Sequence, residues 1–514
     1  MNNGKRYAYK NNLLKKLVTT RSFSIQLFFL LLFILFVAFH NRHVFKKREN
    51  DDNDDDEDDD HVSGDATSSF YTSSNDVVGI ECAYTFAVDE KISTWKDMRV
   101  VISLDRSTSC FQQRPPTWGP GASVFRVHAY SVHEMVTSHA SYIDDEKSYV
   151  ARLLLTFPVK YTVMVLLVHV NGLTTDRLSD VSRPLLRQLL GSPFNITVTK
   201  NHSNTNQATR YCTRNESGRI QGRWVRCGGA VRGLERCGAW LNSDFDLDGI
   251  HGFRWVPYTC QYHQYTNDQL RKCFSRNQWD SVVLAGDDLM KFRTFHWVTR
   301  FHGNCHACAR SSPRRKVFSD GVPRLEWVED PRGTRLPQTF LNKSLDVEKL
   351  LNPKQSSHLD HNHSVFPFDA EALQATVFVL NFGRAVLRET NDMMLINIKL
   401  HTYGKAAQQL QNMGKVVVWL NSPTGTPWSR DHIGDVTSKP RDVPAFRMRH
   451  FNKVAGRIMR HYKIPVVEAF DVADGRIQAV RGHTHYVKKL PGNDFGGVVE
   501  NTITNCIMNF LCNE

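Results

Sequence analysis

The pattern of hydrophobic and polar residues differs between three regions of the chain. Residues 22–39 form one long uncharged run that is rich in phenylalanine and leucine. Between about residues 78 and 173, short runs of valine, leucine and aromatic residues alternate with turn residues, which is typical of several short strands. After about residue 280, continuous apolar runs alternate with amphipathic stretches, which predicts buried strands alternating with helices.

The uncharged run is long enough to cross a membrane, because a span needs roughly 17–25 such residues. A cleaved signal peptide is the alternative, but the basic stretch before the run is long and no small-residue cleavage site follows. Basic residues are more numerous before the run than after it, which favours a luminal or extracellular body. We therefore predict a single-pass type II membrane protein of the Golgi or another secretory compartment, with a tail (1–21) and a signal anchor (22–40).

An acidic block at residues 51–60 follows the anchor. Like charges repel one another and cannot collapse into a core, so residues 41–77 are predicted to form an extended stem. Residues 78–178 are predicted to form a β-sandwich domain, because their strands are short and regularly punctuated. Residues 179–236 lack this pattern but contain cysteines and glycosylation sequons, which indicates a disulfide-tied connector.

The positions of the cysteines and of the glycosylation sequons agree with an oxidising compartment. All eleven cysteines lie after the predicted anchor, and in such a compartment most of them should pair. The odd number leaves one thiol free or in an intermolecular bond. Every Asn-X-Ser/Thr acceptor also follows the anchor, at Asn195, Asn201, Asn215, Asn342 and Asn362.

The charge of the chain narrows the choice of partners only a little. Its 514 residues carry a formal net charge of +13, spread along the sequence. A basic surface can attract acidic glycans, although a solvated surface explains the charge equally well. Nucleic acid does not fit the predicted compartment, so the expected partners are the membrane and a glycan or glycoprotein.

An ordered set of motifs opens the region 237–514. It comprises a Gly-x-Trp, a Trp-x-Pro-x-x-Cys, a Leu-x-x-Cys and an apolar run ending in Gly-Asp, carried by Gly238, Trp240, Trp255, Pro257, Cys260, Leu270, Cys273, Gly286 and Asp287. This set resembles the start of a PC-esterase domain. The C-terminal half is similar to the NXPE branch of that family, whose members join a neurexophilin-like β-domain to a PC-esterase domain.

The resemblance completes the predicted fold class. We expect an α/β protein with a three-layer, SGNH-hydrolase-like domain on a parallel sheet, preceded by the neurexophilin-like β-sandwich and a single N-terminal transmembrane helix. Cys260 and Cys273 match cysteines of the family, and a cysteine closes its last helix. The cysteines predicted to form disulfides are Cys260, Cys273, Cys305, Cys308 and Cys512.

The resemblance also points to the chemistry of the site. In the family, a serine nucleophile follows the Gly-Asp, but here Asp288 occupies that position. Lys291 replaces an arginine and Ala385 replaces a histidine. A carboxylate would repel the developing oxyanion, and an acyl-aspartate anhydride is a poor substitute for a seryl ester. The three replacements together predict lost or altered catalysis.

The remaining site residues are less well defined. His483 and His485 are the candidates for a catalytic base, with Asp471 or Asp474 to orient one of them; two solvated loop histidines are the alternative. Substrate-binding candidates are the turn residues Gly286, Asp287 and Gly383.

The stretch from His302 to Cys308 has zinc-like spacing, but no second Cys-x-x-C occurs and the compartment favours disulfides. No metal or cofactor is therefore expected. The predicted function is that of an NXPE-like PC-esterase-group protein that acts on or binds glycans and has lost its serine chemistry. The alternatives are an active carbohydrate O-acetyltransferase or O-acetylesterase with a rearranged site, and a secreted or adhesion-type ligand.

Overall fold

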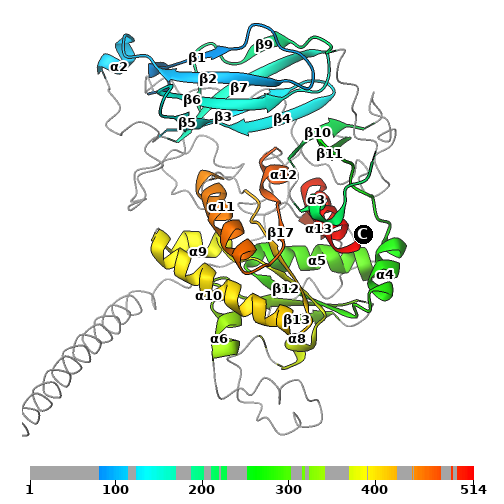
Figure 1. The fold of residues 1–514 in the computed structure, drawn as a ribbon. Helices are drawn as coiled ribbons and strands as arrows, with labels where there is room; N and C mark the ends of the chain where they lie inside the picture. Colours follow the sequence, from blue (N-terminus) through cyan, green and yellow to red (C-terminus); the bar gives the residue numbers. More distant parts are fainter. Residues whose placement is uncertain are drawn as a thin grey trace, which may run out of the picture. The chain divides into compact units, whose positions relative to one another are not determined.

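A computed structural model gives the fold of much of the chain (Figure 1). Contacts divide the chain into two units, Met1–Thr72 and Ser73–Glu514. The residues that the structure describes all lie in the second unit, and the predicted tail, anchor and stem lie outside them. They are residues 80–113, 123–169, 187–201, 210–218, 221–227, 252–302, 315–318, 323–341, 368, 370–390, 392–424, 443, 445–475, 488–489 and 495–513.

Two antiparallel sheets carry the N-terminal part of the described chain. The first sheet has four strands in the order β1 (Tyr84–Val88), β2 (Asp97–Leu104), β6 (Ser148–Leu154), β5 (Ser141–Ile143). The second runs β11 (Phe253–Pro257), β10 (Gly222–Arg226), β4 (Glu134–His139), β3 (Val124–Tyr130), β7 (Lys160–His169), β8 (Arg187–Gln188), with β9 (Phe194–Thr197) on β7. Alternate side chains of both sheets, among them Val100, Phe125 and Val163, share one buried core.

A six-stranded sheet forms the second core. Its order is β13 (Arg315–Phe318), β14 (Arg324–Glu329), β12 (Ser281–Gly286), β15 (Val377–Leu380), β16 (Val416–Leu420), β17 (Val466–Val467). The strands from β14 to β17 are parallel, whereas β13 pairs with β14 in the antiparallel sense. The apolar runs predicted as strands after residue 280 are confirmed, because β12, β15, β16 and β17 lie within them.

Helices cover both faces of this sheet. One face packs against α4 (Asn267–Arg276), α5 (Asp288–His302) and α13 (Val498–Cys512). The other packs against α6 (Arg335–Leu341), α8 (Ala370–Gln374), α9 (Gly383–Glu389), α10 (Met393–Asn412) and α11 (Ala445–His461). Alternation within β12 explains the division, since Val282 and Leu284 belong to the first core and Val283 and Ala285 to the second.

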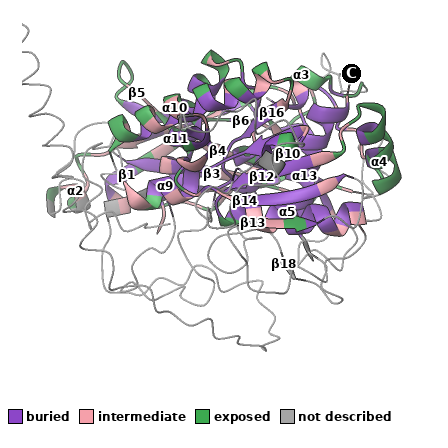
Figure 2. Cartoon of the chain, turned by 90° about the horizontal axis from the view of Figure 1, so that it is seen from below, coloured by how far each residue is buried: buried purple, intermediate pink, exposed green. Residues whose placement is uncertain are grey.

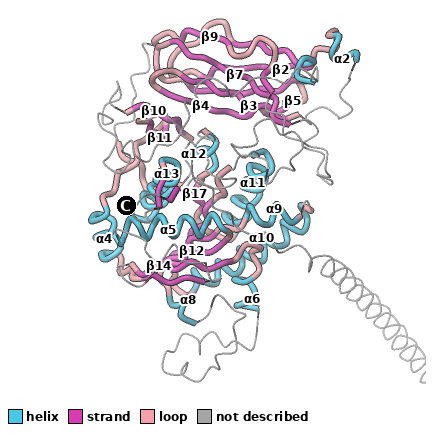
Figure 3. Tube along the Cα trace, turned by 180° about the vertical axis from the view of Figure 1, so that it is seen from behind, coloured by secondary structure: helices cyan, strands magenta, loops and turns pink. Residues whose placement is uncertain are grey.

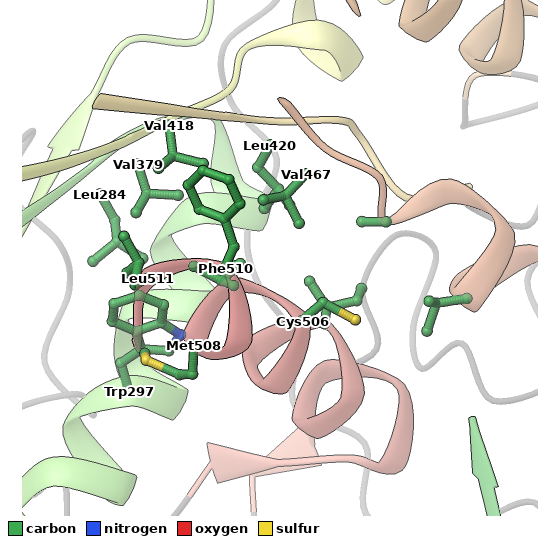
Figure 4. Close-up of a cluster of buried hydrophobic side chains, with 14 of the residues drawn as sticks. Leu284, Trp297, Val379, Val418, Leu420, Val467, Cys506, Met508, Phe510 and Leu511 are labelled. Carbon is green, nitrogen blue, oxygen red and sulfur yellow. The ribbon is translucent and has the colours of Figure 1, made fainter. Parts of the chain in front are cut away.

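Helix α13 is the most deeply placed of these helices, because every one of its residues is buried (Figure 2). Figure 4 shows Phe510 and Leu511 of α13 among Leu284, Val379 and Val418 of the sheet. A helix that is apolar on most of its surface is stable only where neighbours enclose it.

The remaining described elements are short. They are η1 (Ile80–Ala83), α2 (Ser109–Gln113), α3 (Arg214–Ser217), α12 (Phe470–Asp474), β18 (Lys488–Lys489) and β19 (Phe495–Gly496). Figure 3 shows two of them, α2 beside the sandwich and α12 near α13 and β10. Local sequence sets several helix starts. In α4, for example, Thr266 accepts a hydrogen bond from the Gln269 amide while the Gln269 side chain accepts one from the Thr266 amide.

The predicted fold class is wrong and is corrected by these sheets. The protein is a mixed, sheet-rich fold in which several sheets are antiparallel, and even the six-stranded sheet has an antiparallel edge strand. The physical reason is that β13 reads Arg-Lys-Val-Phe and has no continuous apolar run, so the sequence pattern showed neither this edge strand nor its direction. A further part of that class, the transmembrane helix, is not shown either: the described helices include none with the length and apolar content to cross a bilayer.

The sequence also did not show that β10 and β11 belong to the sandwich. Both strands come from beyond residue 178, and β10 pairs with β4 through Trp224 and Met135. The predicted domain boundaries within the body otherwise stay predictions.

Disulfide bonds tie distant segments of the described fold, and two of them are formed by described residues at both ends. Cys212 bonds to Cys260, and Cys273 at α4 bonds to Cys512 at the end of α13. The prediction of disulfide bonding is thus confirmed for Cys260, Cys273 and Cys512, whereas Cys305 and Cys308 lie outside the described residues. Cys506 is a free thiol, buried in the core around α13.

Candidate functional site

Polar residues follow the parallel strands at the edge where those strands end. Asp287 and Asp288 follow β12, Asp330 follows β14, Asn381 follows β15 and Asn421 follows β16. We call these five residues the strand-end cluster. In open sheets of parallel strands, ligands bind at this carboxyl edge, because the loops that leave it can converge on one point.

Backbone hydrogen bonds hold the cluster together. The Asp330 amide donates to the Gly286 carbonyl at 2.8 Å, and the Asn381 amide donates to the Ala285 carbonyl at 3.0 Å. The chain at Gly286 is so close to its neighbour that a Cβ there would lie 1.9 Å from the Asn381 carbonyl oxygen. Glycine is therefore required at the end of β12 for a steric reason.

Gly383, the other predicted glycine, begins α9 and is equally confined. A Cβ at this position would lie 2.4 Å from the Phe451 ring and 2.5 Å from Ser422 Oγ. Close packing thus excludes a side chain at both glycine positions. Their roles in substrate binding stay predictions.

The two adjacent aspartates have opposite environments. Asp287 is buried, and its Oδ1 accepts a hydrogen bond from the Leu289 amide at 3.1 Å, while Oδ2 has no hydrogen-bond partner among the described residues. Burial raises the pKa of Asp287, the charge of Asp288 raises it further, and Arg384 opposes both. Asp288 is the first residue of α5 and is exposed. The position directly after the Gly-Asp pair therefore carries a solvated carboxylate.

Lys291 lies one turn further along α5. Its Nζ is 5.7 Å from the centroid of the Trp327 ring and 5.8 Å from that of Phe292. Contacts of this kind favour a cation over an aromatic face. The ammonium group is therefore placed on aromatic rings rather than paired in the planar fork that an arginine would offer.

A buried network of amides and a hydroxyl lies behind the cluster, and sequence reasoning missed it. Asn381 Nδ2 donates to the Leu420 carbonyl at 2.6 Å and to Ser422 Oγ at 2.8 Å. Asn452 on α11 exchanges two hydrogen bonds with the backbone of Ser422, at 2.8 and 2.9 Å. Ser422 is fully buried, so its hydroxyl positions a loop and does not face a substrate. The available signal was a polar residue directly after each apolar strand.

Asp474, one of the two acidic residues proposed to orient a histidine, has partners in the sandwich instead. Its Oδ2 lies 2.9 Å from His139 Nε2 and 3.8 Å from Arg126 Nε, and Arg126 Nη2 also donates to the Asp474 carbonyl. Burial alone would raise the pKa of Asp474, but Arg126 and His139 together hold it below its ordinary value. This carboxylate therefore joins α12 to strands β3 and β4.

The other predicted site residues are placed only in part. His483 and His485 lie outside the described residues, so their role as a base stays a prediction. Asn195 on β9 and Asn215 on α3 are exposed, Asn201 is half-buried, and Asn342 and Asn362 lie outside the described residues. The described part of the chain contains no group of three or more His, Cys, Asp or Glu side chains placed to hold a metal ion.

The contacts of Asp474 predict a pH-dependent loss of stability in the variant Asp474→Asn. At pH 7 we expect the free energy of unfolding to fall by about 2 kcal/mol, because a charge-assisted hydrogen bond is lost inside the protein. Since the pKa of Asp474 is lowered by folding, its stabilisation is present above the unfolded pKa of roughly 3.9 and disappears as the pH falls through the folded value.

Urea unfolding at pH 7 and pH 3 measures this effect. The difference between the natural protein and Asp474→Asn should shrink at pH 3, and the exposed control Asp145→Asn should change little at either pH. A deficit of the same size at both values would show that the ionisation of Asp474 does not contribute.

Comparison with known proteins adds little to this geometry. No protein-family model and no curated protein matches the chain. A solved structure from Bacteroides vulgatus, assigned as a glycoside hydrolase candidate, is 9% identical, with 74% of this chain and 56% of that chain covered and a TM-score of 0.18. Cwp6 from Clostridium difficile is 7% identical, with 75% and 61% covered and a TM-score of 0.16. The chain thus spans about 56–61% of these two chains, and likenesses this weak carry no argument.

Proposed function

We propose that the protein binds glycans in the secretory pathway or outside the cell, and that its strand-end cluster performs no serine-type ester chemistry. The observation that carries this proposal is the exposed Asp288 at the first position of α5. In the PC-esterase domains that the sequence resembles, the nucleophilic serine occupies this position.

The chemistry of Asp288 supports binding over turnover. Serine-type acyl transfer needs a hydroxyl that a base can deprotonate and amide donors that stabilise an oxyanion. Asp288 has no hydroxyl, and its negative charge stands where the oxyanion would form. A solvated carboxylate is, however, a good acceptor for the hydroxyl groups of a sugar, because each of its oxygens can accept hydrogen bonds.

The disulfides support the proposed location in the secretory pathway or outside the cell. Cys212–Cys260 and Cys273–Cys512 join segments that are far apart in the sequence. Such bonds persist in secretory and extracellular compartments and are rare in the cytosol.

A second candidate function is an active O-acetyltransferase or O-acetylesterase with a rearranged site, and Asp287 favours it. A buried carboxyl group with a raised pKa beside an exposed site is a feature of acid–base catalysts. In this alternative, Asp287 would supply a proton while Asp288 or a water molecule takes the serine's role.

Ester turnover separates these two candidates. We expect the purified protein to show no acetyl-ester hydrolysis or transfer above a heat-denatured control, and Asp288→Ser alone to restore little, because Lys291 and Ala385 are also altered. Robust turnover that is lost in Asp288→Ala or Asp287→Asn would establish the second candidate and refute the first.

Glycan binding tests the proposal directly. On an immobilised glycan panel the natural protein should bind, and Asp288→Ala should weaken that binding by about tenfold, since a hydrogen bond from a sugar to a charged acceptor is lost. The exposed control Asp145→Ala should bind as the natural protein does. Failure of the natural protein to bind any glycan would contradict the proposal.

A further inference from the structure

A cavity of about 680 Å³ opens on the first sheet of the sandwich, far along the chain from the strand-end cluster. The loop between β1 and β2 and the strands β2 and β6 line it. Its volume lies within the range of roughly 300–1,000 Å³ that ligand pockets occupy. We call it the Trp95 pocket, after the aromatic residue in its wall.

The wall of the Trp95 pocket is rich in cations. Four basic residues line it, against two acidic ones, Asp89 and Asp97; the basic residues are Lys91, Lys96, Arg99 and Arg152. Asp89 is already engaged, because its Oδ2 accepts a hydrogen bond from the Arg99 amide at 2.8 Å. The pocket thus has a surplus of positive charge.

Two of these cations lie directly opposite each other. Arg99 on β2 and Arg152 on β6 are register partners, and like charges in such a pair repel and destabilise a sheet. Glu146 contacts Arg99 at 3.1 Å, but Arg152 is exposed and forms no ion pair with any residue that the structure describes. An anionic ligand bound over the two side chains would relieve the repulsion.

Trp95 provides an aromatic surface beside the cations of the pocket. Its φ of 62° lies in the left-handed region, which bulky residues rarely adopt. The surrounding backbone imposes this conformation, because the Trp95 amide donates to the Leu155 carbonyl at 2.8 Å and the Thr94 amide donates to the Thr199 carbonyl at 2.9 Å. Backbone strain of this kind persists where neighbours determine the conformation, and it is concentrated at functional sites.

The buried ion pair between Arg223 and Glu134 supports the Trp95 ring from the protein interior. The Arg223 guanidinium carbon lies 5.2 Å from the Trp95 ring centroid and 5.0 Å from that of Tyr258. Arg223 is itself fixed by Glu134, whose Oε2 accepts from Nε at 2.8 Å, and Glu134 also accepts from Thr156 and Tyr161. The indole is therefore a rigid, half-buried platform, and the apolar face of a sugar ring can pack on it.

We propose that the Trp95 pocket binds an oligosaccharide that carries more than one sulfate or carboxylate group, with the chemistry of a glycosaminoglycan. Trp95 supplies the apolar surface, while Lys91, Lys96 and Arg152 supply donors to the anionic groups. A neutral sugar would leave these cations without counter-charges. This site lies on a different sheet from Asp288, so it does not rest on the proposed function of the strand-end cluster.

The test uses the full chain and a fluorescently labelled hexasaccharide derived from heparin. We expect saturable binding that Arg152→Ala weakens by about tenfold, as expected for the loss of one charge-assisted contact. The matched control Arg457→Ala removes an exposed arginine of α11 and should change the affinity less than about twofold, because only long-range attraction is lost.

A second variant, Trp95→Gly, separates binding from folding. Glycine adopts the φ of Trp95 without strain, so the loop should keep its conformation while the sugar platform is lost. Affinity should again fall by about tenfold, with the circular dichroism spectrum unchanged.

Three outcomes would overturn the proposal: equal losses in Arg152→Ala and Arg457→Ala, equal affinity for neutral maltohexaose, or unaltered binding in both pocket variants. Binding that is lost in Asp288→Ala but kept in Arg152→Ala would likewise refute the pocket while leaving the proposed function intact. Binding that is lost in Arg152→Ala and kept in Asp288→Ala would support it.

Discussion

Replacing Gly286 by alanine should lower the free energy of unfolding by more than about 4 kcal/mol. Losses of this size are typical of substitutions that force a core to rearrange. The new Cβ would lie 1.9 Å from the Asn381 carbonyl oxygen and 2.8 Å from Met290 Cγ. The first of these contacts involves backbone of the adjacent central strand, so neither β12 nor β15 can move without breaking the sheet. Denaturant unfolding of the purified variant measures the loss.

Gly414→Ala is the matched control for this prediction. Gly414 has a φ of 78°, but a Cβ there would meet nothing within 4 Å. Its replacement should therefore show only the conformational penalty of about 1–2 kcal/mol. If the two variants lose the same stability, the close approach at Gly286 is not what makes glycine necessary.

The second large effect is expected where α5 meets α13. Arg293 and Glu500 form a doubly hydrogen-bonded ion pair, at 2.5 and 2.8 Å, and both side chains are buried. Arg293→Met should lower the free energy of unfolding by about 3–5 kcal/mol, because it leaves a carboxylate buried without its counter-charge. Thermal or urea unfolding gives the magnitude.

The double variant Arg293→Met/Glu500→Leu tests that explanation. Apolar side chains of similar size can replace a buried ion pair with little net change, so the double variant should recover most of the stability that the single variant loses. A double variant less stable than Arg293→Met would show that the helices depend on the ion pair itself and not merely on avoiding an unpaired charge.

These two predictions concern packing around Asp288 that does not involve the Asp288 side chain. Gly286 and the Arg293–Glu500 pair hold the strand, the turn and the helix that surround Asp288, and none of them depends on the side chain at position 288. A sequence can thus keep every packing constraint of this turn while its exposed residue changes.

The sequence predicted those parts of the fold that depend on local pattern. Buried apolar runs located β12, β15, β16 and β17, and the Gly-Asp at the end of the first run marked the turn before α5. The expected resemblance pointed to Cys260, Cys273 and Cys512 as disulfide cysteines, and all three form disulfides. Alternation and apolar content are properties of neighbouring residues, so they can be seen without knowing the partners of a strand.

The tertiary structure alone decided how these elements combine. Strand direction, the antiparallel β13, and the addition of β10 and β11 to the sandwich depend on pairing between residues far apart in the sequence. The Trp95 pocket depends on Arg223, a residue 128 positions away, beneath the ring.

The same distinction applies to the candidate site. The sequence drew attention to Asp288, because a second carboxylate directly after the Gly-Asp pair is visible at one position. It could not show that Asp287 is buried while Asp288 is exposed, or that Asp474 pairs with Arg126 and His139. Burial and electrostatic partners arise only when distant segments pack together, and they determine whether a polar residue binds, ionises or merely supports the fold.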